Sequence, residues 1–132
     1  MTESEYEVLR RKAREYKQMA ELAIENDLDE QAIENYNFAL EMLMKAVLVK
    51  EGCNPPKTHD LMIISNTKDS GNRRVLRKAI FSATTVRPMW DKIHSIWSPD
   101  DRYVNLAPEG TDYSDIFEAY KRVYGWIQNK FF

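Results

Sequence analysis

The sequence predicts an all-α protein: an antiparallel up-and-down bundle of four long helices and one short helix, in a single domain over residues 1–132. Two observations support this fold class. Apolar residues recur at steps of three and four along four segments, which is the period of one helix face. No segment alternates apolar and polar residues as a half-buried strand does. With only 4 glycines and 5 prolines, the chain has few breaks between these segments.

The first two helices are predicted over residues 4–27 and 30–51, with Asp29 as the cap of the second. The second helix is apolar on more than one face, so we expect it at the centre of the bundle. Four residues of its main apolar face should be almost wholly buried, namely Tyr36, Leu40, Leu43 and Val47. Gly52 and the Pro55-Pro56 pair then end this helix.

The second half of the chain should contain a short helix and two long ones. Thr58 is placed to cap a short helix over residues 59–67. A long apolar stripe follows over residues 73–97, and Pro88 inside it should kink or split that helix. Asp112 should cap the last helix. These elements complete the predicted bundle.

Charge is distributed unevenly along the chain. Residues 1–51 carry 12 acidic and 7 basic side chains, a balance of −5, whereas residues 70–97 carry 6 basic and 1 acidic, a balance of +5. A basic segment on a protein of net charge −2 is a candidate surface for phosphate groups or an acidic partner. The alternative is that the two segments neutralise each other in the fold.

Composition also argues against several classes of protein. No apolar run approaches the roughly 20 residues that span a bilayer, and the first residues do not resemble a signal peptide. The single cysteine, Cys53, suits a reducing cytoplasm. One Cys and two His are too few for a usual zinc site, so we predict no metal and no cofactor.

The central helix and the loop after it resemble the signature of the HEPN family of small helical domains. In that family a helix of the type Ala-Leu-Glu-x-x-x-Lys-Ala-x-Leu leads into Pro-Pro-x-Thr-His-Asp-Leu. The matching residues here are Ala39, Leu40, Glu41, Lys45, Ala46, Leu48, Pro55, Pro56, Thr58, His59, Asp60 and Leu61. The resemblance implies a bundle that commonly dimerises and acts on nucleotides or RNA. It also implies a frequent partner, a separate minimal nucleotidyltransferase in a toxin–antitoxin pair, which would be another chain.

The loop of the signature is the first candidate site. Lys57, Thr58 and His59 precede a predicted helix, whose free backbone N–H groups attract anions, so they could hold a phosphate. Alternatively, Thr58 and Asp60 cap the helix while His59 bonds back to the bundle and fixes the loop.

Arg87 and His94 form the second candidate site. Catalytic members of the broader HEPN group carry an Arg-x4-6-His motif and cleave RNA without metal, and six residues separate this pair. His94 could transfer a proton to or from the ribose, and Arg87 could stabilise charge on the phosphate. Pro88 stands where that motif usually has a polar residue, so both side chains could instead be surface positions with no special role.

Two further basic features could bind phosphate. Arg102, next to Tyr103, could form a forked contact with a phosphate or a structural ion pair with Glu41, which otherwise needs Lys45. Arg73, Arg74, Arg77 and Lys78 could bind a nucleic-acid backbone or an acidic partner, or form a plain solvated face. No aromatic residue interleaves with these four cations, so base stacking is not indicated.

These features favour a HEPN-like protein that binds nucleotides or RNA. The alternatives are a metal-independent ribonuclease that uses Arg87 and His94, and a non-catalytic protein-interaction module. A homodimer is expected because the central helix is apolar on more faces than one small bundle can cover. Several aromatic residues also exceed the needs of a simple core, namely Trp90, Trp97, Trp126, Phe131 and Phe132.

Overall fold

The computed structural model describes residues 4–95 and 112–132, and these residues form helices without any strand. The elements are α1 (Glu5–Glu25), α2 (Asp29–Lys50), α3 (Leu61–Ser65), α4 (Val75–Ser82), α5 (Arg87–His94) and α6 (Tyr113–Phe131). The all-α class is therefore confirmed. Three of the described helices are long and three are short, because the segment predicted as the third long helix is divided into α4 and α5.

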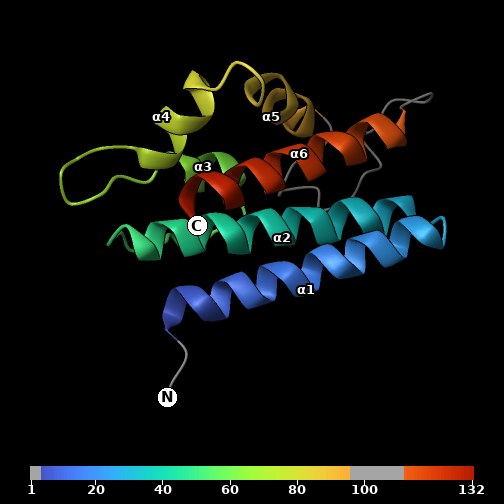
Figure 1. The fold of residues 1–132 in the computed structure, drawn as a ribbon, viewed down its shortest axis with the longest axis horizontal. Helices are drawn as coiled ribbons and strands as arrows, with labels where there is room; N and C mark the ends of the chain where they lie inside the picture. Colours follow the sequence, from blue (N-terminus) through green and yellow to red (C-terminus); the bar gives the residue numbers. More distant parts are fainter. Residues whose placement is uncertain (1–3, 96–111) are drawn as a thin grey trace.

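Helix α2 lies at the centre of the bundle, as the sequence predicted. It contacts α1, α3, α4 and α6, and Figure 1 shows α1 and α6 running along different sides of it. Tyr36, Leu40, Leu43 and Val47 are each at most 1% exposed. Alanines on both helices are buried where α1 and α2 meet, which lets the two backbones approach closely.

Two predicted helix caps are wrong. Leu28, not Asp29, occupies the cap position of α2 and makes no side-chain bond there, while Asp29 is the first helical residue. Asp60, not Thr58, caps α3, and its Oδ1 accepts from the backbone N–H of Met62 at 2.9 Å. Thr58 instead accepts from the backbone N–H of Asp60, so the chain enters the helix later than predicted. The cap at Asp112 is confirmed.

Pro88 splits the predicted helix, and the break falls just before the proline. The chain leaves α4 at Ala83, whose ψ of 98° is extended, and re-enters a helix after Val86. Pro88 then lies in the first turn of α5, where a missing N–H costs no hydrogen bond. The apolar stripe survives the break, since Leu76, Ile80, Val86, Trp90 and Ile93 are all buried; the predicted member Trp97 lies outside the described residues.

None of the helices in residues 4–95 and 112–132 has the length and apolar character that crossing a membrane requires.

Candidate functional site

The cations predicted as one cluster lie together on the start and outer face of α4. Arg73, Arg74, Arg77 and Lys78 are all exposed. With Phe81 and Ser82 they line a shallow hollow of about 390 Å³. Helix α4 has neither a capping side chain nor an acidic residue in its first turn, so nothing within the helix offsets these charges.

Phe81 brings a fifth cation to this face. The guanidinium carbon of Arg77 lies 5.1 Å from the centre of the Phe81 ring, and that of Arg87 lies 4.8 Å from it. Arg77 also donates a hydrogen bond of 2.8 Å to Oδ1 of Asn66, which fixes its position. We call Arg73, Arg74, Arg77, Lys78 and Arg87 the basic surface.

Only one cation of the basic surface has a carboxylate partner among the described residues. Asp69 accepts from Nε of Arg73 at 3.1 Å and from its backbone N–H at 2.8 Å. These contacts lower the pKa of Asp69, the backbone N–H contributing most. The other four charges have no ion pair within residues 4–95 and 112–132, so the predicted alternative of mutual neutralisation does not describe this face.

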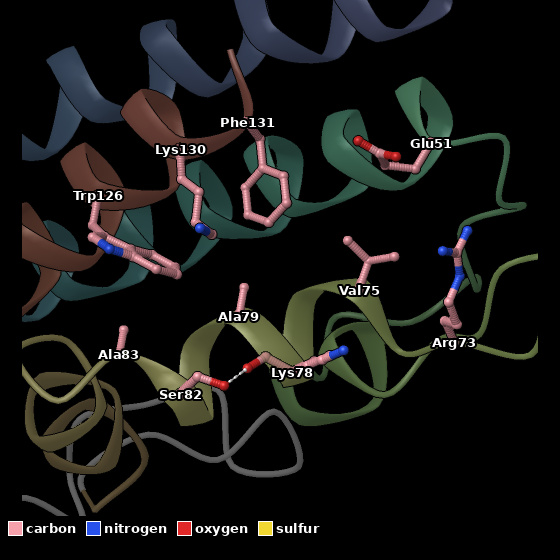
Figure 2. A pocket seen from close by; sticks show the side chains of 10 residues that line it. All are labelled: Glu51, Arg73, Val75, Lys78, Ala79, Ser82, Ala83, Trp126, Lys130 and Phe131. Carbon is pink, nitrogen blue, oxygen red and sulfur yellow. Dashed lines mark hydrogen bonds between the residues drawn. The ribbon is translucent and has the colours of Figure 1, made fainter.

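A groove of about 590 Å³ adjoins the basic surface, between α4 and α6. Figure 2 shows Trp126, Lys130 and Phe131 on the α6 side, facing the α4 wall. Arg73, Lys78 and Ser82 line both this groove and the shallow hollow, so the two are continuous. Aromatic residues that do not interleave with the cations in the sequence thus lie near them in the structure.

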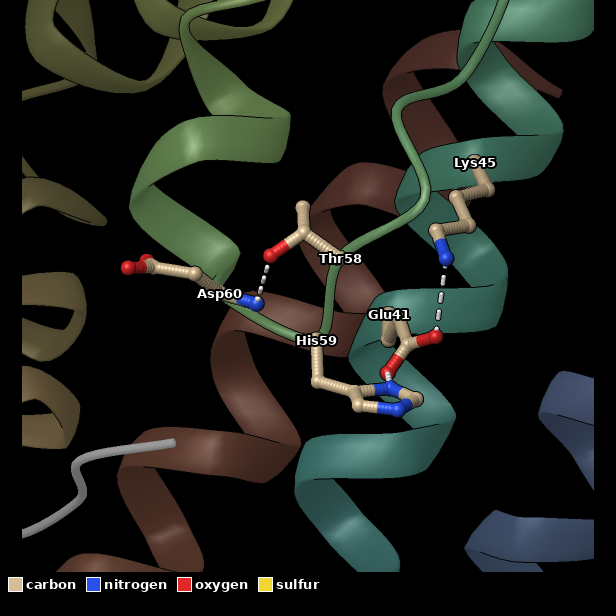
Figure 3. Close-up of polar contacts among 5 residues, drawn as sticks. All are labelled: Glu41, Lys45, Thr58, His59 and Asp60. Carbon is tan, nitrogen blue, oxygen red and sulfur yellow. Dashed lines mark hydrogen bonds and ion pairs between the residues drawn. The ribbon is translucent and has the colours of Figure 1, made fainter. Parts of the chain in front are cut away.

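The signature loop is tied to the central helix by a buried carboxylate. Glu41 is only 2% exposed. Its Oε2 accepts from Nζ of Lys45 at 2.9 Å, and its Oε1 lies 2.7 Å from Nδ1 of His59 (Figure 3). The ring of His59 also meets Phe38 edge-on. His59 thus bonds back to the bundle, which was the structural alternative for this residue.

The structure does not bring the signature loop to the basic surface. Lys57, Thr58 and His59 line neither the shallow hollow nor the groove. Glu41 has the predicted partner Lys45, whereas Arg102, its other predicted partner, lies outside the described residues. The two groups of candidate phosphate-binding residues are therefore separate features of the described structure.

Arg87 and His94 occupy opposite ends of α5 and different surroundings. Arg87 begins the helix and stacks on Phe81, whereas His94 ends it with its ring 4.3 Å from that of Trp90. Nε2 of His94 is buried without a hydrogen-bond partner in the described part of the chain. Burial lowers the pKa of His94, although Asp60 and Asp91 oppose the shift. Arg87 therefore belongs with the basic surface, and His94 packs inward.

Sequence reasoning missed three members of this region. Phe81 follows Arg77 by four residues, which is the spacing of neighbours on a helix face and could have revealed their contact. Trp126 and Lys130 lie far along the chain and carry no local signal of their position beside α4.

The sequence model of the HEPN domain matches residues 6–130. The chain belongs to the HEPN domain family. The resemblance seen in the central helix and the Pro-Pro-Lys-Thr-His-Asp-Leu loop is thereby confirmed. No curated protein and no solved structure gives a significant match. The function of this HEPN chain must therefore be inferred from its own surfaces.

The Glu41 contacts predict a marked loss of stability in Glu41→Gln. The substitution leaves Lys45 and His59 without their buried carboxylate, and we expect the free energy of unfolding in urea to fall by about 1–3 kcal/mol. Glu21→Gln is the matched control, since Glu21 also pairs with a lysine one turn away but is 44% exposed. That control should lose less than about 1 kcal/mol. Equal losses would show that the Glu41 contacts add nothing special.

The partly buried His94 predicts a component of stability that is lost in acid. Because the pKa of His94 is lowered in the folded state, the unfolded chain takes up a proton first, near the ordinary histidine pKa of about 6.5. Stability should therefore decrease as pH falls from about 7 to 5. His94→Phe keeps an aromatic ring beside Trp90 but cannot titrate, and His59 is present in both proteins. In urea unfolding, the free energy of unfolding of the variant should increase relative to that of the wild type as pH falls. If the difference between the two free energies does not change with pH, this account is contradicted.

Proposed function

We propose that this HEPN domain is a nucleotide- or RNA-associated binding protein whose basic surface contacts the phosphates of its ligand. The observation that carries the proposal is the convergence of Arg77 and Arg87 on Phe81, beside Arg74 and Lys78. It concentrates positive charge on one exposed face of a protein whose net charge is −2. Such a face attracts polyanions over long range and holds them by charge-assisted hydrogen bonds.

Helix stability does not account for these cations. Positive side chains in the first turn of a helix are unfavourable by about 0.3–1 kcal/mol each at low ionic strength, because the backbone dipole is positive there. Arg74 is the cap residue of α4, and Arg77 and Lys78 follow within its first turns. A bound phosphate would relieve this repulsion and accept from the uncapped N–H groups of the helix.

The ribonuclease alternative has less support from the geometry. Arg87 is engaged with Phe81, and the His94 imidazole is packed against Trp90. The interaction module remains the alternative if no phosphate ligand binds. RNA cleavage in EDTA that is lost in His94→Ala would reverse this order and favour the enzyme.

We also propose a homodimer, and a separate nucleotidyltransferase chain as partner in a toxin–antitoxin pair. The family resemblance suggests the second partner. The predicted reason for the dimer needs revision, because the described helices already bury the inner faces of α2, and Trp90 is in the core. Exposed apolar side chains are found instead on α1 and the turn after it, at Met19, Leu22 and Leu28, and on α3, at Met62 and Ile63. Light scattering at tens of micromolar should give the mass of a dimer; a monomer alone would exclude it.

The binding proposal predicts that charge position, not net charge, controls affinity for RNA. Arg74→Ala with Lys78→Ala should weaken binding of a single-stranded RNA oligomer at low salt. It should also flatten the plot of log affinity against log salt by about 0.7 for each phosphate that the variant no longer binds. Lys12→Ala with Lys121→Ala is the matched control, because both lysines are exposed, line neither the hollow nor the groove, and carry the same total charge. Fluorescence anisotropy measures the affinity of both double variants and its dependence on salt.

Two outcomes would contradict the proposal. Equal weakening by the two double variants would mean that only net charge matters. No binding of RNA or nucleotides at low salt would leave the protein-interaction module as the function.

A further inference from the structure

The groove between α4 and α6 has one aromatic wall and one wall of small side chains. Trp126 and Phe131 are partly buried against the core, and their rings meet at 87° with centres 6.5 Å apart. Opposite them, Figure 2 shows Val75 and Ala79 of α4 and Ala83, which follows the helix. Because alanine carries only a methyl group, the α4 wall leaves room for the groove between it and the aromatic wall. The shape suits a flat apolar ring.

The edges of the same groove are cationic. Nζ of Lys130 lies over the Trp126 ring, 5.8 Å from its centre, so a base would stack on the other face of the indole. Lys78 and Arg73 line the side that joins the basic surface. Glu51 is the single acid among the lining residues and lies toward the Arg73 end, as Figure 2 shows. An anionic group is therefore favoured near Lys78 and Lys130, away from Glu51.

The size of the groove sets a limit on its occupant. Its volume of about 590 Å³ is within the range of about 300–1,000 Å³ typical of small-ligand sites. It is large enough for one nucleotide unit but not for a folded partner. The walls of the groove suit a flat ring, and its cationic edges suit phosphate groups. A ligand with a flat ring and a phosphate on either side of it would match both.

We propose that this groove receives an unpaired base of single-stranded RNA, which stacks on Trp126 while the flanking phosphates contact Lys78 and Lys130. The inference rests on the proposed function and narrows it to single-stranded ligands. In duplex RNA the bases are paired and stacked within the helix, so they cannot enter a groove in a protein. Stacking on an aromatic side chain accepts any base, because every base has a flat face.

The test separates the base from the phosphate backbone. Three ligands of equal length are titrated by fluorescence anisotropy at low salt: a single-stranded RNA oligomer, an abasic oligomer with the same backbone, and a duplex of the RNA. The wild type should bind the single strand at least about fivefold more tightly than the abasic strand, the lower end of what one stacked base contributes.

Two variants each alter one wall of the groove. Trp126→Ala removes the stacking surface, and Ala79→Leu fills the space opposite it without changing charge. Either should reduce the affinity for the single strand toward that for the abasic strand, whereas Trp126→Phe should retain most of the difference. Lys12→Ala, on α1, is the control that should leave the preference unchanged. Thermal unfolding checks that each variant is folded. If Trp126→Ala does not fold, Ala79→Leu alone provides the test.

The outcomes distinguish this inference from the proposed function. If the wild type binds all three ligands equally, the basic surface holds phosphates but the groove takes no base, and the inference is wrong. Persistence of the preference in both Trp126→Ala and Ala79→Leu would also overturn it. If none of the three ligands binds at low salt, the proposed function fails and the inference fails with it.

Discussion

The buried carboxylate of Glu41 is the contact on which the arrangement of the second half of the chain depends. A carboxylate in the middle of the most buried helix is costly unless its charge is compensated and its oxygens are hydrogen-bonded. Lys45 supplies the opposite charge, and His59 supplies a second hydrogen-bond contact. Because His59 comes directly before the α3 cap residue Asp60, its bond to Glu41 fixes where that helix begins. Helix α3 in turn contacts α4, and Asn66 at its end holds Arg77. The signature loop therefore positions the basic surface without being part of it.

The break between α4 and α5 adds Arg87 to the basic surface. In one continuous helix, Arg77 and Arg87 would be separated by about 15 Å along the axis and would point in different directions. The extended backbone at Ala83 and the new start at Pro88 bring both guanidinium groups to the ring of Phe81. Pro88, which weakens the resemblance to the ribonuclease motif, thus helps to place Arg87 beside Phe81. Arg87 joins the basic surface, while His94 packs against Trp90 at the other end of α5.

Under the proposed function, the basic surface and the groove would each contribute a different part of nucleic-acid binding. Phosphate contacts by exposed cations are sequence-independent and strongly dependent on salt. The groove adds an aromatic wall, supplied by α6 rather than by the basic helix itself, and this wall is the proposed surface for a base. Family membership describes the bundle and its signature loop, which positions these features. The binding site proposed for this particular chain lies in side chains outside that loop, between Arg73 and Arg87 and in the last turns of α6.

The sequence by itself determined the all-α class, the central place of α2 and the HEPN family, because apolar period and the signature loop are local properties of the chain. It also indicated the basic cluster and the partner Lys45 of Glu41, since residues four apart meet on a helix. Only the tertiary structure decided that Arg87 joins that cluster, that His94 packs inward, and that Trp126 faces α4. These facts depend on the direction the chain takes after Ala83 and on the packing of α6 against α5 and α2, which no local spacing specifies.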